Sequence, residues 1–271
     1  MTTGSSLLDG LLEIAAAAAS AVLDTYLTDF DVELKGPNDP VTSADRRANQ
    51  LICDALRDLH PGCPIVAEES APSAFGDYQH APQVFFVDPV DGTREFVKRT
   101  GEFVVMIGCV QERQARAGII WSPTLETVWI GEVSLGAFRR TSQGAFVPIH
   151  PAAKTSTDAA RLLVSRAHDP VESLSLQTRL EVPRLEAMGS AGLKAAAVAD
   201  GTADAYVAPR YAGKRWDACA PDAIVTAAGG VFTDGTGSAV DYRSEDLVNR
   251  LGLVAANATL HRLLIQRLRP S

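Results

Sequence analysis

Acidic residues follow an apolar segment at a spacing that suits metal binding. The segment 84–87 is apolar, and residues 88–93 read Asp-Pro-Val-Asp-Gly-Thr. Two carboxylates three residues apart across a tight turn can converge on a hard cation, and a turn carbonyl such as that of Val90 can add an oxygen ligand. The N–H groups of Gly92 and Thr93 can face an anion. The segment therefore predicts a site for a cation and a phosphate together, although Asp and Gly are also common turn residues.

Further acidic residues stand at the ends of other expected elements. Glu68 and Glu69 follow a short apolar segment, Asp217 stands where a helix is expected to begin, and Asp45 lies in the first turn of another helix. Each has a simpler interpretation, because paired glutamates are common in solvated loops and acids are favoured at helix N-termini. Together with the two aspartates of segment 88–93, they form a pattern that indicates a shared acidic site.

The first half of the chain is expected to hold two helices and a sheet. Apolar residues recur at helical spacing over residues 5–27, and a second helix is expected to begin at 41–43 and to stop at 61–62. The runs 84–87, 103–110, 117–121 and 127–130 are typical of strands. These elements predict an α+β half with a largely antiparallel sheet, with a turn at Pro89.

The second half shows a different, alternating pattern. Strands are expected at 162–164, 205–207 and 230–232, and helices at 190–199 and 217–228. We therefore expect a boundary near residue 152. Residues 1–152 would form an α+β half that carries most of the acidic ligands, and residues 153–271 would form an α/β half that completes the site. No internal repeat or linker separates the halves, so they are expected to pack as layers of one unit.

Composition and charge limit the possible partners. Of 271 residues, 46% are hydrophobic and 21% charged, which excludes a disordered, collagenous or coiled-coil protein. The net charge of -8 repels nucleic-acid backbones and anionic membranes, so neither is an expected partner. An acidic protein can still bind phosphates if it recruits cations.

Cysteine spacing and the N-terminus point to the expected compartment. The four cysteines form no CxxC pair, and the five histidines are scattered, so neither a zinc site nor a disulfide scaffold is expected. The uninterrupted apolar run at 14–19 is too short for a signal peptide or a membrane span. The protein is expected in the cytoplasm, as a monomer or a homodimer.

Three motifs, taken in order, resemble a known family. Glu68-Glu69-Ser70, the segment 88–93 and the Trp-Asp-Ala-Cys-Ala run at 216–220 resemble the signatures of the inositol monophosphatase superfamily of Mg²⁺-dependent, lithium-sensitive phosphomonoesterases. The resemblance covers nearly the whole chain and implies a layered α-β-α-β-α sandwich of the inositol monophosphatase and sugar phosphatase type. Departures are mild: Ala67 stands where many members have Gly, and Val90 replaces Ile or Leu.

The resemblance implies a metal site and a catalytic pair. It implies that the side chains of Glu68, Asp88, Asp91 and Asp217 and the backbone carbonyl of Val90 hold two or three Mg²⁺ ions. Asp88 would bridge two of these ions. Thr93 and Asp45 would orient and deprotonate the attacking water, and Glu68 would also contact a water-bearing third metal. Lys35 belongs to a segment, 35–40, that resembles a family loop closing over the metals.

Other segments resemble one branch of the superfamily. Segments 95–103, 189–194 and 214–221 are similar to the 3'(2'),5'-bisphosphate nucleotidases. This implies hydrolysis of the 3'-phosphate of 3'-phosphoadenosine 5'-phosphate to AMP and phosphate, which clears a by-product of sulfate assimilation. The substrate contacts expected by resemblance are Gly92, Thr93, Ser190, Lys194 and Arg210. Lys194 would meet a second phosphate, or would otherwise be a surface lysine with its stem packed on apolar groups.

Two alternatives to this function remain. An inositol monophosphatase or a broader sugar phosphatase would use the same metal core. A non-catalytic module that only binds metal or nucleotide would usually lack an acidic ligand, and none of the expected acids is missing here.

Overall fold

The computed structural model describes residues 3–37, 39–142, 144–166 and 170–269. The helices are α1 (Ser6–Tyr26), α2 (Ser43–Leu59), α3 (Thr93–Val97), α4 (Pro170–Leu180), α5 (Ala191–Ala199), α6 (Arg215–Ala227) and α7 (Ala258–Leu268), with a 3-10 turn at Pro72–Ala74. The strands are β1 (Val32–Gly36), β2 (Asp39–Thr42), β3 (Ile65–Ala67), β4 (Gln83–Asp91), β5 (Val104–Gln111), β6 (Gln114–Ser122), β7 (Thr127–Glu132), β8 (Gly136–Thr141), β9 (Val147–Pro148), β10 (Leu162–Ser165), β11 (Leu185–Met188), β12 (Ala205–Ala208), β13 (Val231–Thr233) and β14 (Leu253–Ala256).

Two large sheets carry the architecture. The first has seven strands in chain order, β3 to β9. Its β3 runs parallel to β4, and every later neighbour is antiparallel. The second has five strands in the order β11-β10-β12-β14-β13. Here β10 is parallel to β11 and β12, whereas β14 is antiparallel to both of its neighbours. A separate two-stranded hairpin joins β1 and β2.

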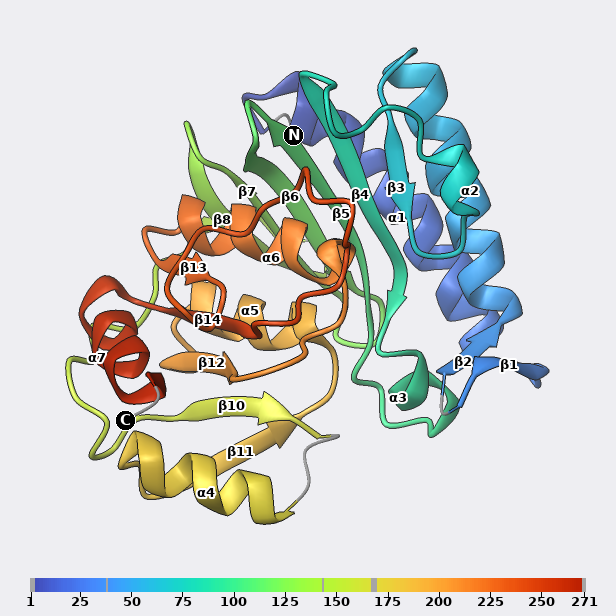
Figure 1. Ribbon diagram of the computed structural model, residues 1–271. Helices are drawn as coiled ribbons and strands as arrows, with labels where there is room; N and C mark the ends of the chain where they lie inside the picture. Colours follow the sequence, from blue (N-terminus) through green and yellow to red (C-terminus); the bar gives the residue numbers. More distant parts are fainter. Residues whose placement is uncertain (1–2, 38, 143, 167–169, 270–271) are drawn as a thin grey trace.

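Helices cover both sheets and form the layered sandwich that the family resemblance implies (Figure 1). Helices α1 and α2 lie on one face of the seven-stranded sheet, and α5 and α6 lie between the two sheets. Helices α4 and α7 cover the outer face of the five-stranded sheet. Alternate residues of β4 serve different layers: Phe85 and Val87 pack with α1 and α2, whereas Val84 and Phe86 pack with α5 and α6. This is the period-2 pattern of a strand that is buried on both faces.

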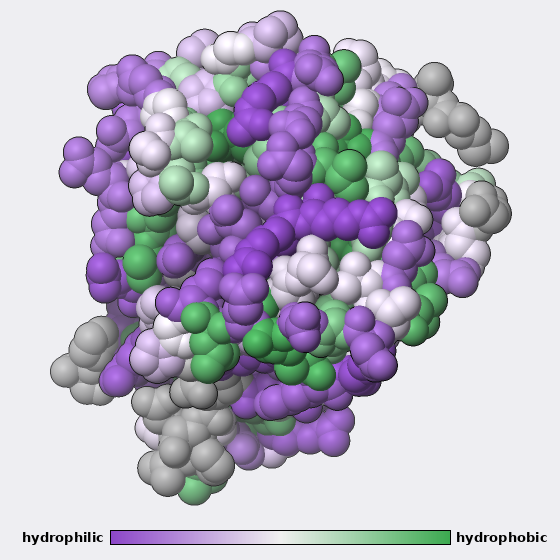
Figure 2. All heavy atoms as spheres, turned by 90° about the vertical axis from the view of Figure 1, so that its right-hand side faces the viewer, coloured by the Kyte–Doolittle hydropathy of each residue, from purple (hydrophilic) through white to green (hydrophobic). Residues whose placement is uncertain are grey.

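Helix α1 is long and apolar enough to cross a membrane by length and composition. In the fold it is a core helix, because its buried residues belong to the same cluster as α2 and the sheet. Its Ser5 side chain accepts a hydrogen bond from the Leu8 amide and so caps the N-terminus. The face of the molecule near α1 and α2 mixes hydrophilic and hydrophobic side chains (Figure 2).

A row of glycines lets α6 lie directly against the sheet. Gly108, Gly118 and Gly131 are paired neighbours on β5, β6 and β7. A Cβ atom on Gly118 would stand 2.9 Å from the Ala220 Cα, and one on Gly131 would stand 2.9 Å from the Ile224 Cα. The row therefore forms a shallow groove for α6, which carries Asp217.

Several expectations about the elements are confirmed and others are wrong. The two N-terminal helices, the four strand runs and the antiparallel sheet of the first half are confirmed within a few residues. The expected turn at Pro89 is wrong, because β4 continues to Asp91. Helix α6 begins at Arg215, two residues earlier than expected. The sequence did not predict β1, β2, β8, β9, β11, β14, α4 or α7. The boundary near residue 152 lies between β9 and β10 and stays a prediction.

Candidate metal centre

A β-bulge brings the two aspartates of β4 to one side of the strand. Asp88 pairs with Met106 and Asp91 with Val104, so three steps along β4 match two steps along β5. In a regular strand, residues three apart point to opposite faces, and the extra residue reverses that relation. Gly92 then follows with φ of 100°, where a Cβ would stand 2.6 Å from the Glu102 carbonyl oxygen. The carboxylates converge through this bulge instead of the predicted turn.

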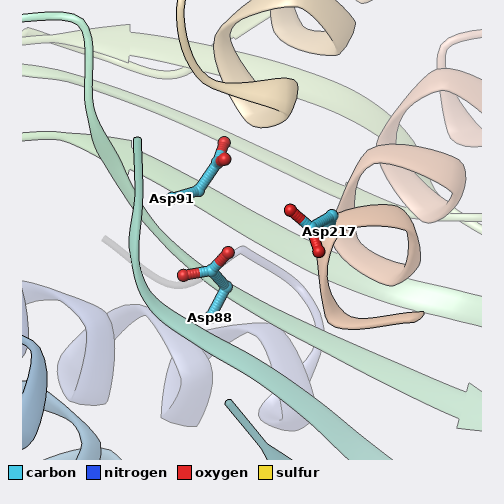
Figure 3. Close-up of side chains that lie close together, drawn as sticks. All are labelled: Asp88, Asp91 and Asp217. Carbon is cyan, nitrogen blue, oxygen red and sulfur yellow. The ribbon is translucent and has the colours of Figure 1, made fainter. Parts of the chain in front are cut away.

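Three carboxylates meet at this point (Figure 3). Asp88 and Asp91 come from β4 and Asp217 from the first turn of α6. One carboxylate oxygen of each lies within 4.8 Å of the other two. Asp88 is 2% exposed and Asp91 6%. The cluster therefore combines residues of the seven-stranded sheet with a residue of the helix layer between the sheets, so both halves of the chain contribute to it, as expected from the sequence.

The N-terminus of α5 fixes the Asp91 carboxylate. The Ser190 hydroxyl donates to Asp91 Oδ2 at 2.5 Å, and the Gly192 amide donates to the same oxygen at 2.7 Å. Lys194 Nζ donates to the carbonyl oxygens of Ser190 at 2.6 Å and Met188 at 3.2 Å. Lys194 is only 3% exposed, so its alternative interpretation as a surface lysine is wrong. In this structure Ser190 and Lys194, both expected to contact substrate, support Asp91.

Asp217 is held by the start of its own helix. It is the third residue of α6, and its Oδ2 accepts a hydrogen bond from the Lys214 amide at 2.7 Å. A first-turn acid that satisfies the amide before the helix is half of a capping box. Asp217 is therefore the third residue of the helix and not its N-cap, which is Lys214. A Cβ on Gly213, at φ of 66°, would stand 2.5 Å from Asp217 Oδ2, so this close approach requires glycine.

Asp45 and Thr93 form a pair beside the cluster. Asp45 is fully buried at the start of α2, where its Oδ2 accepts from the Thr42 amide at 2.8 Å and the Thr42 hydroxyl at 2.6 Å. The Thr93 Oγ1 lies 2.9 Å from Asp45 Oδ1 and 3.0 Å from the Val90 carbonyl oxygen. Burial raises the pKa of Asp45. Its hydrogen bonds with Thr42 and Thr93 act in the opposite direction.

Glu68 approaches the cluster from β3. Its backbone amide donates to the Val87 carbonyl oxygen, which places it beside β4. The Glu68 carboxylate raises the pKa of both Asp88 and Asp217. Lys35 Nζ lies 3.1 Å from Glu68 Oε1 and 2.5 Å from Glu69 Oε1. The β1–β2 hairpin, which the resemblance identified as a closing loop, is thus tied to the acidic pair.

The charges of the cluster are poorly compensated by the chain itself. Burial and the neighbouring carboxylates raise the pKa of Asp88 and of Asp217 well above their usual range. The N-termini of α5 and α6 offset part of this repulsion. A set of converging carboxylate oxygens is the donor set that Mg²⁺ prefers, and a divalent cation would remove the repulsion. The residues present therefore fit such an ion.

The cluster lies in a cavity of about 780 Å³. Its lining includes every residue that the sequence predicted for the site except the buried Asp45. Lys194 contributes to the wall, and burial lowers its pKa to about 8. Arg210 is exposed at the wall. The sequence reasoning missed Glu69 as the partner of Lys35, and also Tyr211, which lines the cavity beside Arg210. The only sequence signal for Tyr211 was its position directly after that arginine.

Comparisons with known proteins show the family to which the chain belongs. The model of the inositol monophosphatase family matches residues 5–271. The 3'(2'),5'-bisphosphate nucleotidase CysQ of Escherichia coli (strain K12) is 31% identical over 239 residues, covering 87% of this chain and 94% of that protein. The solved structure of the extragenic suppressor protein suhB from Bartonella henselae has a TM-score of 0.83 at 25% identity, over 98% of this chain and 100% of that chain. CysQ from Bacteroides thetaiotaomicron has a TM-score of 0.75 at 26% identity, over 94% of this chain and 98% of that chain. The chain therefore belongs to the inositol monophosphatase family.

Proposed function

We propose that the protein is a Mg²⁺-dependent 3'(2'),5'-bisphosphate nucleotidase that hydrolyses the 3'-phosphate of 3'-phosphoadenosine 5'-phosphate to AMP and phosphate. The observation that carries the proposal is one cavity that joins three converging carboxylates to Lys194 and Arg210. The carboxylates suit the metals that a phosphomonoester dianion needs, and the two cations suit a second phosphate on the same substrate. The similarity to the CysQ nucleotidases supports the same substrate class.

The Mg²⁺ ions would be held by Glu68, Asp88, the Val90 carbonyl, Asp91 and Asp217. When bound, they supply charge neutralisation and lower the pKa of a water molecule. Ser190 and the Gly192 amide keep the Asp91 carboxylate oriented throughout.

Thr93 and Asp45 would carry the proton. In the proposed step, the attacking water donates a hydrogen bond to Thr93 Oγ1 while that hydroxyl donates to Asp45 Oδ1. The proton of the water passes to Thr93, and the Thr93 proton passes to Asp45. Burial raises the pKa of Asp45 and so favours its protonated form at the end of the transfer.

Different residues of the cavity wall would bind the two substrate phosphates. The amides of Gly92 and Thr93 would contact the reacting phosphate. The Lys194 ammonium group has three N–H donors. Two of them donate to the carbonyl oxygens of Met188 and Ser190, so the third would be available to the second phosphate. Arg210 would contact the same distal phosphate.

A substrate panel tests the proposal. With Mg²⁺ present, we expect kcat/KM for 3'-phosphoadenosine 5'-phosphate to exceed that for inositol 1-phosphate by at least about 100-fold, because a correctly placed charged contact is worth about 3 kcal/mol. An Asp91→Asn preparation made in parallel measures any contaminating phosphatase. A preference for inositol 1-phosphate would reject the nucleotidase assignment.

An inositol monophosphatase or a broader sugar phosphatase is the second candidate. The similarity to the inositol monophosphatase of Thermotoga maritima, with a TM-score of 0.82 at 25% identity, favours it, because the metal cluster does not depend on the organic part of the substrate. A non-catalytic function is disfavoured, since the acidic residues are all present. The cytoplasmic location, lithium sensitivity and the choice between monomer and homodimer stay predictions.

A further inference from the structure

Three aromatic residues line the cavity that holds the carboxylate cluster: Tyr206, Tyr211 and Trp216. Two of them are buried and have a cation over the ring. Lys194 Nζ lies 5.2 Å from the ring centroid of Tyr206, which is 3% exposed. Lys214 Nζ lies 4.8 Å from the ring centroid of Trp216, which is 5% exposed. These two rings are therefore packed inside the protein, and each already has a lysine of this chain as its partner.

Tyr211 differs from both. It is 64% exposed, and within the described ranges it is the one large exposed hydrophobic residue that lines this cavity. It belongs to the segment that leads from β12 into α6 and follows Arg210 directly. It lines the same cavity as the carboxylates of Asp217 and Glu68. Partial burial and these carboxylates raise the pKa of the Tyr211 phenol.

An exposed aromatic ring in the wall of a cavity offers a flat apolar surface with a polar edge to a planar partner. A planar base is such a partner, since stacking on an aromatic side chain requires no hydrogen-bond pattern and leaves the phosphates free to reach the cations. The cavity of about 780 Å³ is also larger than a single phosphate group requires and lies within the range of small-molecule sites.

We propose that Tyr211 forms the nucleobase subsite of this cavity and determines its specificity by stacking on the base of the substrate. The inference rests on the proposed nucleotidase function and deepens it. Arg210 and Tyr211 would then bind two chemically different parts of one nucleotide, the distal phosphate and the base, through consecutive residues. Substrates without a base would gain nothing from the ring.

The test removes the ring and the base separately. Steady-state kinetics with Mg²⁺ are measured for 3'-phosphoadenosine 5'-phosphate and for 1,4-anhydroribitol 3,5-bisphosphate, which keeps both phosphates and lacks the base. Both substrates are tested on the wild type, Tyr211→Leu and Tyr211→Phe. Leu174→Ala is the matched control, because Leu174 lies on α4 and is 65% exposed.

For the nucleotide, Tyr211→Leu is expected to raise KM about tenfold, with kcat changed by less than about twofold, whereas Tyr211→Phe keeps the ring and stays near the wild type. For the base-free substrate, all variants should have the same KM within about twofold. The effect on KM of removing the ring and the effect on KM of removing the base should therefore be non-additive.

Two results would overturn the subsite. One is an unchanged KM of Tyr211→Leu for the nucleotide. The other is an equal rise of KM for both substrates, which would assign the ring to the sugar, to a phosphate or to the local fold. If the wild type hydrolyses the base-free substrate or inositol 1-phosphate and not the nucleotide, the proposed function itself fails. That outcome is visible before any variant is compared.

Discussion

The Thr93 hydroxyl oxygen lies 2.9 Å from the Oδ1 atom of Asp45, 48 positions earlier in the chain. The contact joins the N-terminus of α2 to the N-terminus of α3, immediately beside the metal cluster. The hydroxyl has one proton and two possible acceptors, Asp45 Oδ1 and the Val90 carbonyl oxygen at 3.0 Å. A water molecule that donates to Thr93 would favour the pairing with Asp45.

Replacing this hydroxyl by a methyl group should slow the chemical step. Thr93→Val is expected to lower kcat by about 100-fold or more with little change in KM, the size of effect found for general acid–base groups. Thr93→Ser keeps the hydroxyl and should retain most of the activity. Initial rates over a range of substrate concentrations measure both. A Thr93→Val enzyme with the kcat of the wild type would remove Thr93 from the proton path.

Asp91→Asn should abolish hydrolysis and preserve the fold. The amide oxygen can still accept from the Ser190 hydroxyl and the Gly192 amide, so the start of α5 should keep its geometry. The Asp91 carboxylate raises the pKa of Asp88 and Asp217, so its loss reduces repulsion in the metal-free cluster. We expect weaker Mg²⁺ binding by calorimetry and an unchanged or higher melting temperature.

The control for that experiment is Asp54→Asn, which neutralises an exposed acid on α2. Its activity and Mg²⁺ affinity should match the wild type. Tight Mg²⁺ binding by Asp91→Asn, at the wild-type stoichiometry, would contradict the assignment of Asp91 as a ligand.

Asp222 should make stability depend on pH. It accepts hydrogen bonds from the Tyr242 hydroxyl at 2.9 Å and the Thr226 hydroxyl at 3.1 Å, and burial raises its pKa to about 7. Between about pH 4 and pH 7 the unfolded chain loses this proton while the native protein keeps it. The contribution of Asp222 therefore becomes less favourable as pH rises through that window and is constant above it.

Asp222→Asn removes this titration. The free energy of unfolding of the variant, relative to the wild type, should rise by about 2 to 3 kcal/mol between pH 5 and pH 8. Urea unfolding at both pH values measures the difference. Because the Tyr242 hydrogen bond lowers the pKa, Tyr242→Phe should move the step to higher pH. A difference between Asp222→Asn and wild type that is constant with pH would show that Asp222 titrates normally.

Gly118→Ala should disturb the position of α6. The added Cβ would stand 2.8 Å from the Ala220 carbonyl oxygen, and the backbone of a buried helix cannot move away without repacking. We expect a loss of about 1 to 3 kcal/mol in unfolding free energy and a lower Mg²⁺ affinity. Gly10→Ala is a suitable comparison, because its nearest neighbour is the end of the Leu59 side chain. Equal effects of the two substitutions would argue against a specific role of the groove.

The sequence predicted the acidic residues of the site but not how they are brought together. Residue type and spacing at 88–93 indicated convergence, whereas the bulge depends on the register with β5, which the sequence of β4 does not contain. The burial of Lys194 depends on α5 lying between two sheets. Lys35 meets Glu69, 34 positions later in the chain, only because the tertiary fold brings the β1–β2 hairpin to the residues that follow β3. Short elements such as the two-residue β9 have too little sequence for a periodic pattern.

The glycine row under α6 allows metal binding and substrate choice to depend on different parts of the chain. At Gly108, Gly118 and Gly131 the helix rests on sheet backbone, so no side chain of these three strand positions sets the distance between α6 and the sheet. The segment of Arg210, Tyr211 and Ala212 lies outside that contact and lines the cavity. Substitutions in this segment can therefore change which phosphate ester is accepted while the carboxylates that would hold the metals keep their positions.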